Sequence, residues 1–522
     1  MSVKEKCFYD VKKTLFVQNE AVELILKYSK RSKKVTVQLN NNEPFHIYHQ
    51  KYKKNQIMRD ESNTKWCKYV EKKIKKEINK SSYKKSYIIT LCQGYSVDDL
   101  DTSNINIHVK KTLQLKSKMV FAYLTHKDMI KLKNKNSNKI CEVQTDSYVN
   151  TPEQNGYPSF VQSNSFSATS TLIPCSGRIQ DLDADNSRRA IGQQNQITFT
   201  FPQEVNGIYN PNVVYLFIFD TGIARHRYLS INENRSRNYV RNNNGSVDPN
   251  DWFDRNGHGT HVAGTAASTI HGIAATTFNG NPNANQVISI KVLPDNGSGG
   301  LASWCIEAQN DVIQFARQHR DANIVVNMSL GANGGSNNIM NNPRYYDSPD
   351  RIVVVCAAGN RDSDVALSNF QPANSPGSIV VGNSAGTVTR RCNSNFGPRV
   401  DFFAPGTNIR STWLNNQFNV LSGTSMAAPS LAGVATFILA HNNILGNSLN
   451  INVRRNRKTI FAILRCLSRT LSCIVPNALS IPVNLCNQDP RMTNTTRLIL
   501  NMEGLGTLFL LHRWGLSQCQ FN

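Results

Sequence analysis

Short, nearly continuous apolar runs alternate with longer stretches of helical periodicity from about residue 210 onward. Runs of this kind, rich in β-branched residues, are typical of strands that are buried on both faces. They occupy Val213–Phe219, Val287–Val292, Ile324–Met328, Ile352–Ala357 and Ser378–Val381. The pattern predicts helices over 258–268, 301–319 and 425–442. This repeated alternation predicts an α/β fold with a mostly parallel central sheet.

A second, smaller pattern lies in residues 86–149. Residues 87–91, 120–124 and 140–144 are predicted strands, because they are apolar and rich in β-branched or aromatic residues. Thr125 is a candidate N-cap for a helix over 126–134. The sequence therefore predicts a small α+β domain ahead of the larger fold. Residues 1–80 are Lys-rich with short apolar patches, and no function is assigned to them.

The charge of the chain is unevenly distributed. Residues 1–150 carry 31 Lys and Arg against 15 Asp and Glu, which is a net charge of +16 out of +23 for the whole chain. Of those 31 basic residues 29 are Lys, whereas after position 150 only Lys291 and Lys458 remain and Arg predominates. Lys and Arg differ in hydration and geometry, so the shift indicates a module boundary near residue 150.

A basic N-terminal segment can contact nucleic acid, a membrane or an acidic partner, or can simply be a solvated surface. The run Lys72–Lys76 lies near Trp66 and Tyr69, which weakly favours nucleic-acid stacking. No recognisable nucleic-acid-binding module surrounds it. The solvated surface is the favoured interpretation, and nucleic-acid binding is kept as an alternative that salt-sensitive retention on DNA or RNA would reveal.

Targeting signals and cysteine motifs add little. No run of about 18 apolar residues predicts a transmembrane helix, and the first residues lack the apolar core of a secretory signal. The 12 cysteines form no C-x-x-C pair, so a zinc or thioredoxin-like site is not expected. The cysteines could form disulfides or could be free buried thiols, and the sequence does not decide between these alternatives. It also does not predict the cellular compartment of the protein.

Two segments carry residues suited to acid–base chemistry. Asp220 ends a predicted buried strand and is followed by Thr and Gly, which is typical of a turn or of an aspartic protease. An aspartic protease needs two such carboxylates, and a second Asp-Thr-Gly is lacking. His258 stands among small residues in Asn-Gly-His-Gly-Thr-His, without the Glu that a zincin would place before His261. The simpler alternative is a helix start with two structural histidines.

Two further segments carry a candidate nucleophile and a candidate hydrogen-bond donor. Ser425 follows Gly423 at a predicted helix start, where backbone N–H groups have no intrahelical partner and negative charge is favoured. That environment suits a nucleophile whose attack creates an oxyanion, although an N-cap Ser would look similar. Asn360 ends the predicted strand 352–357 with a neutral amide, which could stabilise an oxyanion or could simply form a turn.

The four residues occur in the order Asp220, His258, Asn360 and Ser425, with spacings of 38, 102 and 65 residues. Asp before His before Ser is the order of subtilisin, and the chain resembles the subtilisin superfamily, most closely the proteinase K group. The resemblance is strong over 205–445 and weaker to about 488, while 86–149 is similar to the inhibitory propeptide of these enzymes. Supporting strings are Ile290–Gly299, Val326–Gly331, Asp401–Thr407 and Ser411–Trp413.

The resemblance implies a role for each residue. Ser425 would attack the scissile carbonyl, His258 would transfer the proton, and Asp220 would orient the imidazole. Asn360 and the backbone N–H of Ser425 would bind the oxyanion. Substrate would pair as an added strand, and its side chain would enter a pocket that is roomy and largely apolar because the residues lining it are small. The implied substrate-binding residues are Ser329, Leu330, Gly331, Ala357, Ala358 and Gly359.

The sequence departs from the family pattern at two places. Ser430 stands where the family usually has His, one turn after the nucleophile, so we expect an effect on packing rather than loss of activity. The proteinase K group has a calcium-binding Asp shortly after the string that corresponds to 381–384, but the stretch Gly382–Thr389 contains no acid. We therefore expect no required cofactor and no metal ligands, with calcium as an alternative whose expected acid is missing.

Together these observations predict a subtilisin-like three-layer α/β fold preceded by a small propeptide domain, in a monomeric serine endopeptidase. Its expected partners are protein or peptide substrates and its own propeptide, and we expect it to process itself near residue 150. The rival interpretation, an inactive binding module on this fold, predicts a missing catalytic residue, whereas all four are present. The predicted domains are 1–85 (Lys-rich extension), 86–150 (propeptide), 151–488 (peptidase) and 489–522 (tail).

Overall fold

A computed structural model describes residues 11–48, 84–151, 213–332 and 352–440, each with short gaps, and parts of 460–464. The chain divides into two compact units. The first contains the residues up to Tyr148 together with Leu301–Ser303, and the second begins at Val149. Each unit is considered by itself. In the part of the chain that is described, no helix is long and apolar enough to cross a membrane.

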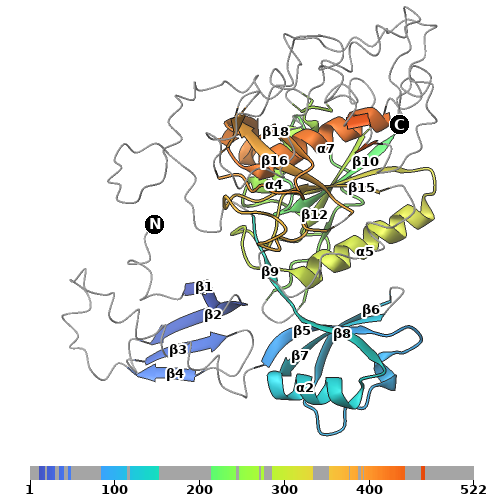
Figure 1. Ribbon diagram of the computed structural model, residues 1–522. Helices are drawn as coiled ribbons and strands as arrows, with labels where there is room; N and C mark the ends of the chain where they lie inside the picture. Colours follow the sequence, from blue (N-terminus) through green and yellow to red (C-terminus); the bar gives the residue numbers. More distant parts are fainter. Residues whose placement is uncertain are drawn as a thin grey trace, which may run out of the picture. The chain divides into compact units, whose positions relative to one another are not determined.

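A mostly parallel sheet forms the centre of the second unit (Figure 1). Its order is β11-β12-β10-β14-β15-β16-β17, and β18 also pairs with β16. Every pairing is parallel except that of β16 with β17. The strands are β10 (Val214–Asp220), β11 (Arg237–Asn238), β12 (Asn285–Lys291), β14 (Asn323–Met328), β15 (Ile352–Ala357), β16 (Ile379–Ala385), β17 (Thr389–Arg390) and β18 (Phe402–Pro405).

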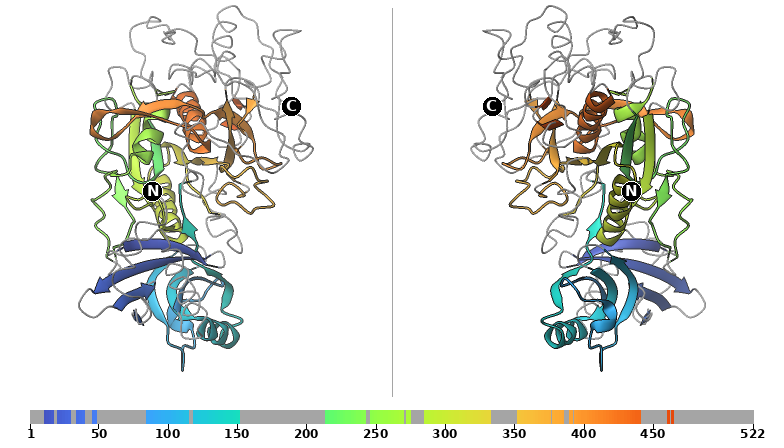
Figure 2. Two further views of the ribbon diagram at one scale, coloured as in Figure 1. Left: turned by 90° about the vertical axis from the view of Figure 1, so that its left-hand side faces the viewer. Right: turned by 90° about the vertical axis from the view of Figure 1, so that its right-hand side faces the viewer.

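Helices cover both faces of this sheet, and the alternation of side chains along β10 shows how. Leu216 and Ile218 belong to the apolar core that also contains residues of α4 (His258–Ala267) and α7 (Thr424–Ala440). Tyr215 and Phe217 point to the other face, where both rings contact Phe315 of α5 (Ala302–Gln318). Figure 2 shows α5 and α7 apart, on either side of the strands. This confirms the predicted three-layer α/β architecture.

The remaining strands of this part of the chain are short. β19 (Ile409–Thr412) and β20 (Phe418–Leu421) form an antiparallel hairpin. β13 (Gly300–Leu301) precedes α5. Buried Ser411 and Thr412 of β19 donate hydrogen bonds to the backbone carbonyls of His261 and Thr260, each at 2.8 Å. The hairpin therefore fixes the outer side of α4.

The first unit contains a four-stranded antiparallel sheet of order β6-β7-β5-β8. Its strands are β5 (Lys84–Leu91), β6 (His108–Gln114), β7 (Lys118–Thr125) and β8 (Ile140–Thr145), and β9 (Tyr148–Val149) follows. Helix α2 (His126–Lys135) begins after Thr125, whose hydroxyl accepts the N–H of Asp128 at 3.1 Å. The predicted cap and the three predicted strands are thus present, and β6 is an addition. A disulfide joins Cys92 to Cys141.

A separate four-stranded sheet precedes these elements, within the Lys-rich segment to which no structure was assigned from the sequence. Its order is β1-β2-β3-β4, and all its pairings are antiparallel. The strands are β1 (Val11–Val17), β2 (Glu20–Ser29), β3 (Lys34–Leu39) and β4 (Phe45–Tyr48). The run Lys72–Lys76 with its nearby aromatic residues lies outside the described residues.

Candidate active site

Asp220 and His258, which are 38 residues apart in the sequence, meet at the carboxyl end of β10. Asp220 is the last residue of β10, and His258 is the first residue of α4. His258 Nδ1 lies 2.7 Å from Asp220 Oδ1, and the same oxygen accepts the N–H of Thr221 at 2.7 Å. Both side chains are buried. Because Nδ1 faces Asp220, the second ring nitrogen of His258, Nε2, is the one that could exchange a proton with another group.

Glycine is required where α4 approaches β10. A Cβ added to Gly259 would lie 2.1 Å from the carbonyl oxygen of Gly222 and 3.0 Å from Cβ of Asp220. Real atoms do not approach so closely, so any larger residue would push the helix away from the strand. The small residues around His258 therefore permit the short distance between the carboxylate and the imidazole.

Burial raises the pKa of Asp220 above its usual value, because the carboxylate loses its hydration. The charge of His258 and the hydrogen bonds from His258 and from the Thr221 N–H lower the pKa and so oppose that effect. A buried carboxylate held by these donors is suited to stabilising positive charge on the imidazole.

Ser425 is the second residue of α7, next to the predicted substrate-binding segment that follows β14. Its hydroxyl donates to the carbonyl oxygen of Ser329 at 3.4 Å. The hydroxyl of Ser329 in turn donates to the carbonyl oxygen of Ser425 at 2.8 Å. Both residues are buried, so the start of α7 and the end of β14 are held together by two reciprocal contacts.

Thr424 fixes the position of Asn360 relative to α7. The N–H of Thr424 donates to Asn360 Oδ1 at 2.9 Å, and its hydroxyl accepts the N–H of Gly359 at 3.0 Å. Because Oδ1 accepts this hydrogen bond, the orientation of the amide is fixed, and its NH₂ group (Nδ2) points the other way. Gly359 has a φ of 100°, and a Cβ there would lie 2.5 Å from Asn395 Nδ2, so only glycine fits this turn. These contacts place the end of β15 and the start of α7 beside each other.

Residues 150 and 151 pair with the predicted substrate-binding segment. Asn150 and Gly331 form an antiparallel bridge in which the N–H of each donates to the carbonyl oxygen of the other, at 3.1 and 2.9 Å. The N–H of Thr151 donates to the carbonyl of Gly297 at 3.2 Å. The N–H of Gly299 donates to the side-chain oxygen of Asn150 at 2.8 Å. A segment of the chain itself thus lies between two backbone edges.

The other predicted pocket residues lie on the adjacent strand ends. Leu330, Ala357 and Ala358 are completely buried. A Cβ added to Gly331 would lie 2.2 Å from Cζ of Phe370, so this aromatic ring, which sequence reasoning did not select, packs directly behind the pairing segment. Residues 333–335 of the predicted pocket lie outside the described residues.

Ser430, which replaces the usual family histidine, lies within α7 and connects this helix to the end of β18. Its hydroxyl is 3.1 Å from the carbonyl of Met426 and 3.2 Å from the carbonyl of Pro405. The side chain is buried. These contacts fit the expected role in packing.

The stretch where the resemblance would place a calcium-binding acid follows Val381. Residues 382–385 supply no carboxylate, and Ser384 is paired with Arg390 on the neighbouring strand. The guanidinium of Arg390 is buried and donates to Asp362 Oδ1 at 3.0 Å. Among the described residues, no group of three or more His, Cys, Asp or Glu side chains could hold a metal ion.

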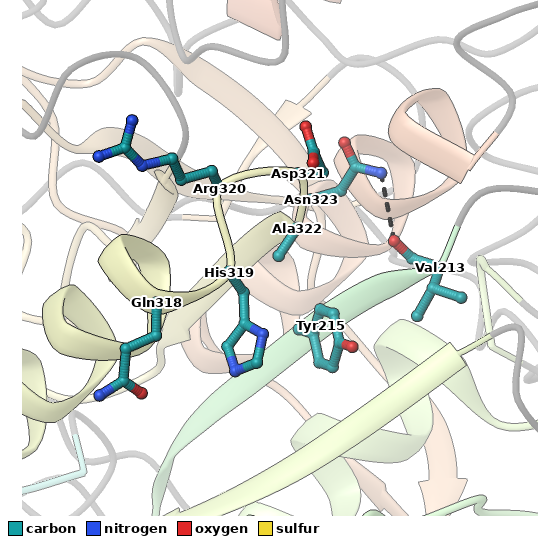
Figure 3. A pocket seen from close by; sticks show the side chains of 8 residues that line it. All are labelled: Val213, Tyr215, Gln318, His319, Arg320, Asp321, Ala322 and Asn323. Carbon is teal, nitrogen blue, oxygen red and sulfur yellow. Dashed lines mark hydrogen bonds between the residues drawn. The ribbon is translucent and has the colours of Figure 1, made fainter.

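A pocket of about 430 Å³ lies elsewhere, at the amino ends of β10 and β14 (Figure 3). Two of the residues that line the pocket are joined by a hydrogen bond, which Asn323 donates to the carbonyl of Val213 at 3.2 Å. Asp220 ends β10 and Ser329 follows β14, so both lie at the opposite, carboxyl ends of these strands. In parallel sheets ligands bind at the carboxyl ends, so this pocket is separate from the candidate site. Its lining residues are Val213, Tyr215, Gln318, His319, Arg320, Asp321, Ala322 and Asn323.

Comparison with known proteins agrees with this arrangement. Residues 212–459 match the family described as the subtilase family. This part of the chain, with its parallel sheet and the Asp220–His258 pair, is therefore a subtilisin-like domain of that family.

Two fungal relatives illustrate the similarity. The chain is 40% identical over 186 residues to the subtilisin-like serine protease AsES of Sarocladium strictum, covering 35% of this chain and 45% of that protein. It is 34% identical over 249 residues to an alkaline proteinase of Hapsidospora chrysogena, covering 46% and 56%. The chain thus spans about half the length of these curated relatives.

A solved structure of a cold adapted subtilisin-like serine proteinase is 27% identical to this chain. The alignment covers 61% of this chain and 97% of that one, with a TM-score of 0.43.

Proposed function

We propose that this chain is a serine endopeptidase in which Asp220, His258 and Ser425 form the catalytic triad. The observation that carries the proposal is the 2.7 Å contact between Asp220 Oδ1 and His258 Nδ1 at the carboxyl edge of the sheet. The family match of the surrounding domain supports the reaction class. The proposal needs no cofactor, because the nucleophile, the base and the oxyanion donors all come from the chain.

In the proposed reaction, Ser425 Oγ attacks the scissile carbonyl carbon and its proton passes to His258 Nε2. In this structure the hydroxyl donates to the Ser329 carbonyl instead, so it must rotate before attack. Contacts of this kind often tighten only when substrate is bound. His258 then gives the proton to the leaving amine, while Asp220 holds the tautomer that protonates Nδ1 and stabilises the imidazolium.

The oxyanion that forms on the attacked carbonyl would be bound by two donors. One is the backbone N–H of Ser425, close to the N-terminus of α7, and the other is Nδ2 of Asn360. The hydrogen bond from the Thr424 N–H to Asn360 Oδ1 supports this assignment, because it orients the amide before the reaction begins. Donors that are already oriented stabilise developing charge without reorganisation.

Substrate would bind as an added strand along Ser329, Leu330 and Gly331. The pairing of Asn150 with Gly331 supports this mode, because the chain places one of its own segments there in strand geometry. A segment held in this way is also the natural first substrate. We therefore propose that the chain cuts itself between about residues 146 and 156, and that the released domain can act as an inhibitor.

We further propose broad specificity with a preference for apolar and aromatic residues before the scissile bond. Leu330, Ala357, Ala358 and Gly359 carry no charge, and the three apolar side chains are fully buried. A buried Lys or Arg of the substrate would need a paired acid, and these segments supply none. Discrimination among apolar residues should be loose, since one methylene in such a pocket contributes only about 1–3 kcal/mol.

Ser425→Ala tests the assignment of the nucleophile. The variant should fold, should hydrolyse peptides far more slowly than the wild type, and should remain at full length when purified. Rates and N-terminal sequencing of both proteins give the answer, with Ser422→Ala on the same loop as the matched control. A folded Ser425→Ala protein with more than about a tenth of the wild-type rate would refute the triad. Processing of this variant at the wild-type bond would show that another protease cuts the chain.

A further inference from the structure

Asp254 is a buried acid four residues before His258 that none of the proposed roles uses. It is only 5% exposed, and its carboxylate accepts five hydrogen bonds. Oδ1 accepts the hydroxyl of Thr221 at 2.9 Å and the N–H groups of Asn256 and Gly257 at 2.8 and 2.9 Å. Oδ2 accepts the N–H of Thr260 at 2.9 Å and its hydroxyl at 2.6 Å. A carboxylate that accepts this many hydrogen bonds holds two segments of the chain in fixed positions.

One of these segments is the start of α4. The first N–H groups of a helix lack partners within the helix, and Gly257, which precedes His258, has no side chain with which to cap them. Asp254 supplies the missing acceptor for the N–H groups of Gly257 and Thr260. The position of the His258 backbone therefore depends on the carboxylate of Asp254.

The other segment is the loop that leaves β10. Thr221 adjoins Asp220 and donates its N–H to Asp220 Oδ1. Its hydroxyl donates to Asp254 Oδ1 and accepts the N–H of Gly259, the residue after His258, at 2.9 Å. Thr221 thus connects the loop that carries Asp220 to the helix that carries His258.

From these contacts we infer that Asp254 is a positioning residue for the proposed reaction, acting through Thr221 to hold Asp220 and His258 at hydrogen-bonding distance. The inference rests on the proposed triad. Asparagine cannot replace the acid, because one of its two terminal atoms is an NH₂ group that would face donors on Thr260 or on Thr221, Asn256 and Gly257. Leaving those donors without acceptors would displace either the helix start or the loop.

Kinetics provide the first test. In the full-length protein, Asp254→Asn and Thr221→Val should each lower kcat about tenfold to hundredfold, the scale on which small misplacements of catalytic groups act. KM should change less than about twofold, because neither residue lies on the substrate-pairing segment. Thr221→Ser, which keeps the hydroxyl, should restore most of the rate. The double variant Asp254→Asn/Thr221→Val should be little slower than the slower single variant, since both changes break the same connection.

Thr265→Ala is the matched control. Thr265 is buried in the same helix, where its hydroxyl donates to the carbonyl of His261 at 2.9 Å. It is not one of the five hydrogen-bond donors to Asp254 described above. This variant should lose thermal stability while keeping kcat. If Asp254→Asn lowers the melting temperature by as much as Thr265→Ala and leaves kcat unchanged, Asp254 is only structural and the inference is wrong.

A second measurement separates this inference from the proposed activity. In the Ser425→Ala background, the proton shared by His258 Nδ1 and Asp220 should give a downfield ¹H NMR resonance, identified by its absence from an Asp220→Ala derivative. Adding Asp254→Asn should shift or broaden that resonance, and Thr265→Ala should not. An unchanged resonance overturns the inference whether or not the wild-type protein hydrolyses peptides. A changed resonance in a protein without peptidase activity supports it and refutes the proposed function instead.

Discussion

Removal of the Cys92–Cys141 disulfide should destabilise the sheet of β5–β8 strongly. The bond joins the residue after β5 to the second residue of β8, and the two cysteines are 49 residues apart in sequence. Between them lie β6, β7 and α2. The cross-link therefore closes a loop that contains most of the β5–β8 sheet and its helix α2.

The size of the effect follows from the length of that loop. Closing a loop of about 49 residues in the unfolded chain lowers its entropy by about 14 cal/mol/K, which corresponds to about 4 kcal/mol at 25 °C. A unit of the size of residues 84–149 is expected to have a free energy of unfolding of about 3–10 kcal/mol. Its apolar core includes Tyr87, Ile89, Val120 and Leu132. Loss of the cross-link should thus remove a large part of its stability.

Urea unfolding of full-length protein in the Ser425→Ala background measures this effect. The transition of the first unit should move by about 4 kcal/mol in a Cys92→Ala/Cys141→Ala variant, while that of the second unit stays in place. Cys305→Ala, which changes a buried cysteine of α5, is the control and should leave the first transition unchanged. A shift below about 1 kcal/mol would refute the loop-closure argument. In an active background the variant should release peptidase activity sooner, because an unfolded inhibitor binds poorly.

Three further outcomes are expected. Asn360→Ala should lower kcat by about 10²–10³ with little change in KM, a magnitude carried over from subtilisin's own oxyanion-hole asparagine rather than calculated for this chain; a change confined to KM would show that Asn360 binds substrate. A peptide library should favour apolar and aromatic residues before the scissile bond, and a tenfold preference for Arg or Lys in kcat/KM would mean that an acid from elsewhere reaches the pocket. Pro152→Ala should speed self-cleavage in a time course followed by mass spectrometry. Proline has no N–H to donate to a neighbouring strand, so alanine at this position should let the substrate segment pair more fully. An unchanged rate, with Glu153→Ala as control, would show that this N–H is not used.

The elements that depend on local pattern could be predicted from the sequence. Strands β10, β12, β14 and β15 and the starts of α4, α5 and α7 lie within two residues of their predicted positions, because continuous apolar runs and glycine turns mark them. Strand β16 begins one residue after its predicted start but extends to Ala385, four residues beyond its predicted end. Strand β6 was missed, since its sequence His-Val-Lys-Lys-Thr-Leu-Gln has only two apolar residues. The strands β1–β4 lie in a segment whose lysines obscured the alternation of their apolar residues.

Contacts between distant residues were beyond sequence reasoning. The pairing of Cys92 with Cys141 depends on the register of β5 and β8, in which Leu91 lies opposite Ile140. Asp254 looks in sequence like a solvated acid in a polar loop, and only its burial shows otherwise. A usable signal was nevertheless present, because an acid close before a helix whose N-cap is glycine is a candidate capping group. The roles of Asp220, His258, Asn360 and Ser425 stay predictions until the variants are measured.

The pairing of Asn150 with Gly331 makes the segment that lies on the predicted substrate-binding strand a covalent part of the chain. A tethered ligand meets its site at an effective concentration on the order of millimolar, however dilute the protein is. After a cut beyond Thr151, the same segment is retained only by its own affinity, so its occupancy falls as the sample is diluted. An uncut sample should therefore show the same low specific activity at every protein concentration. A cut sample should become more active per molecule once it is diluted below the dissociation constant of the released domain.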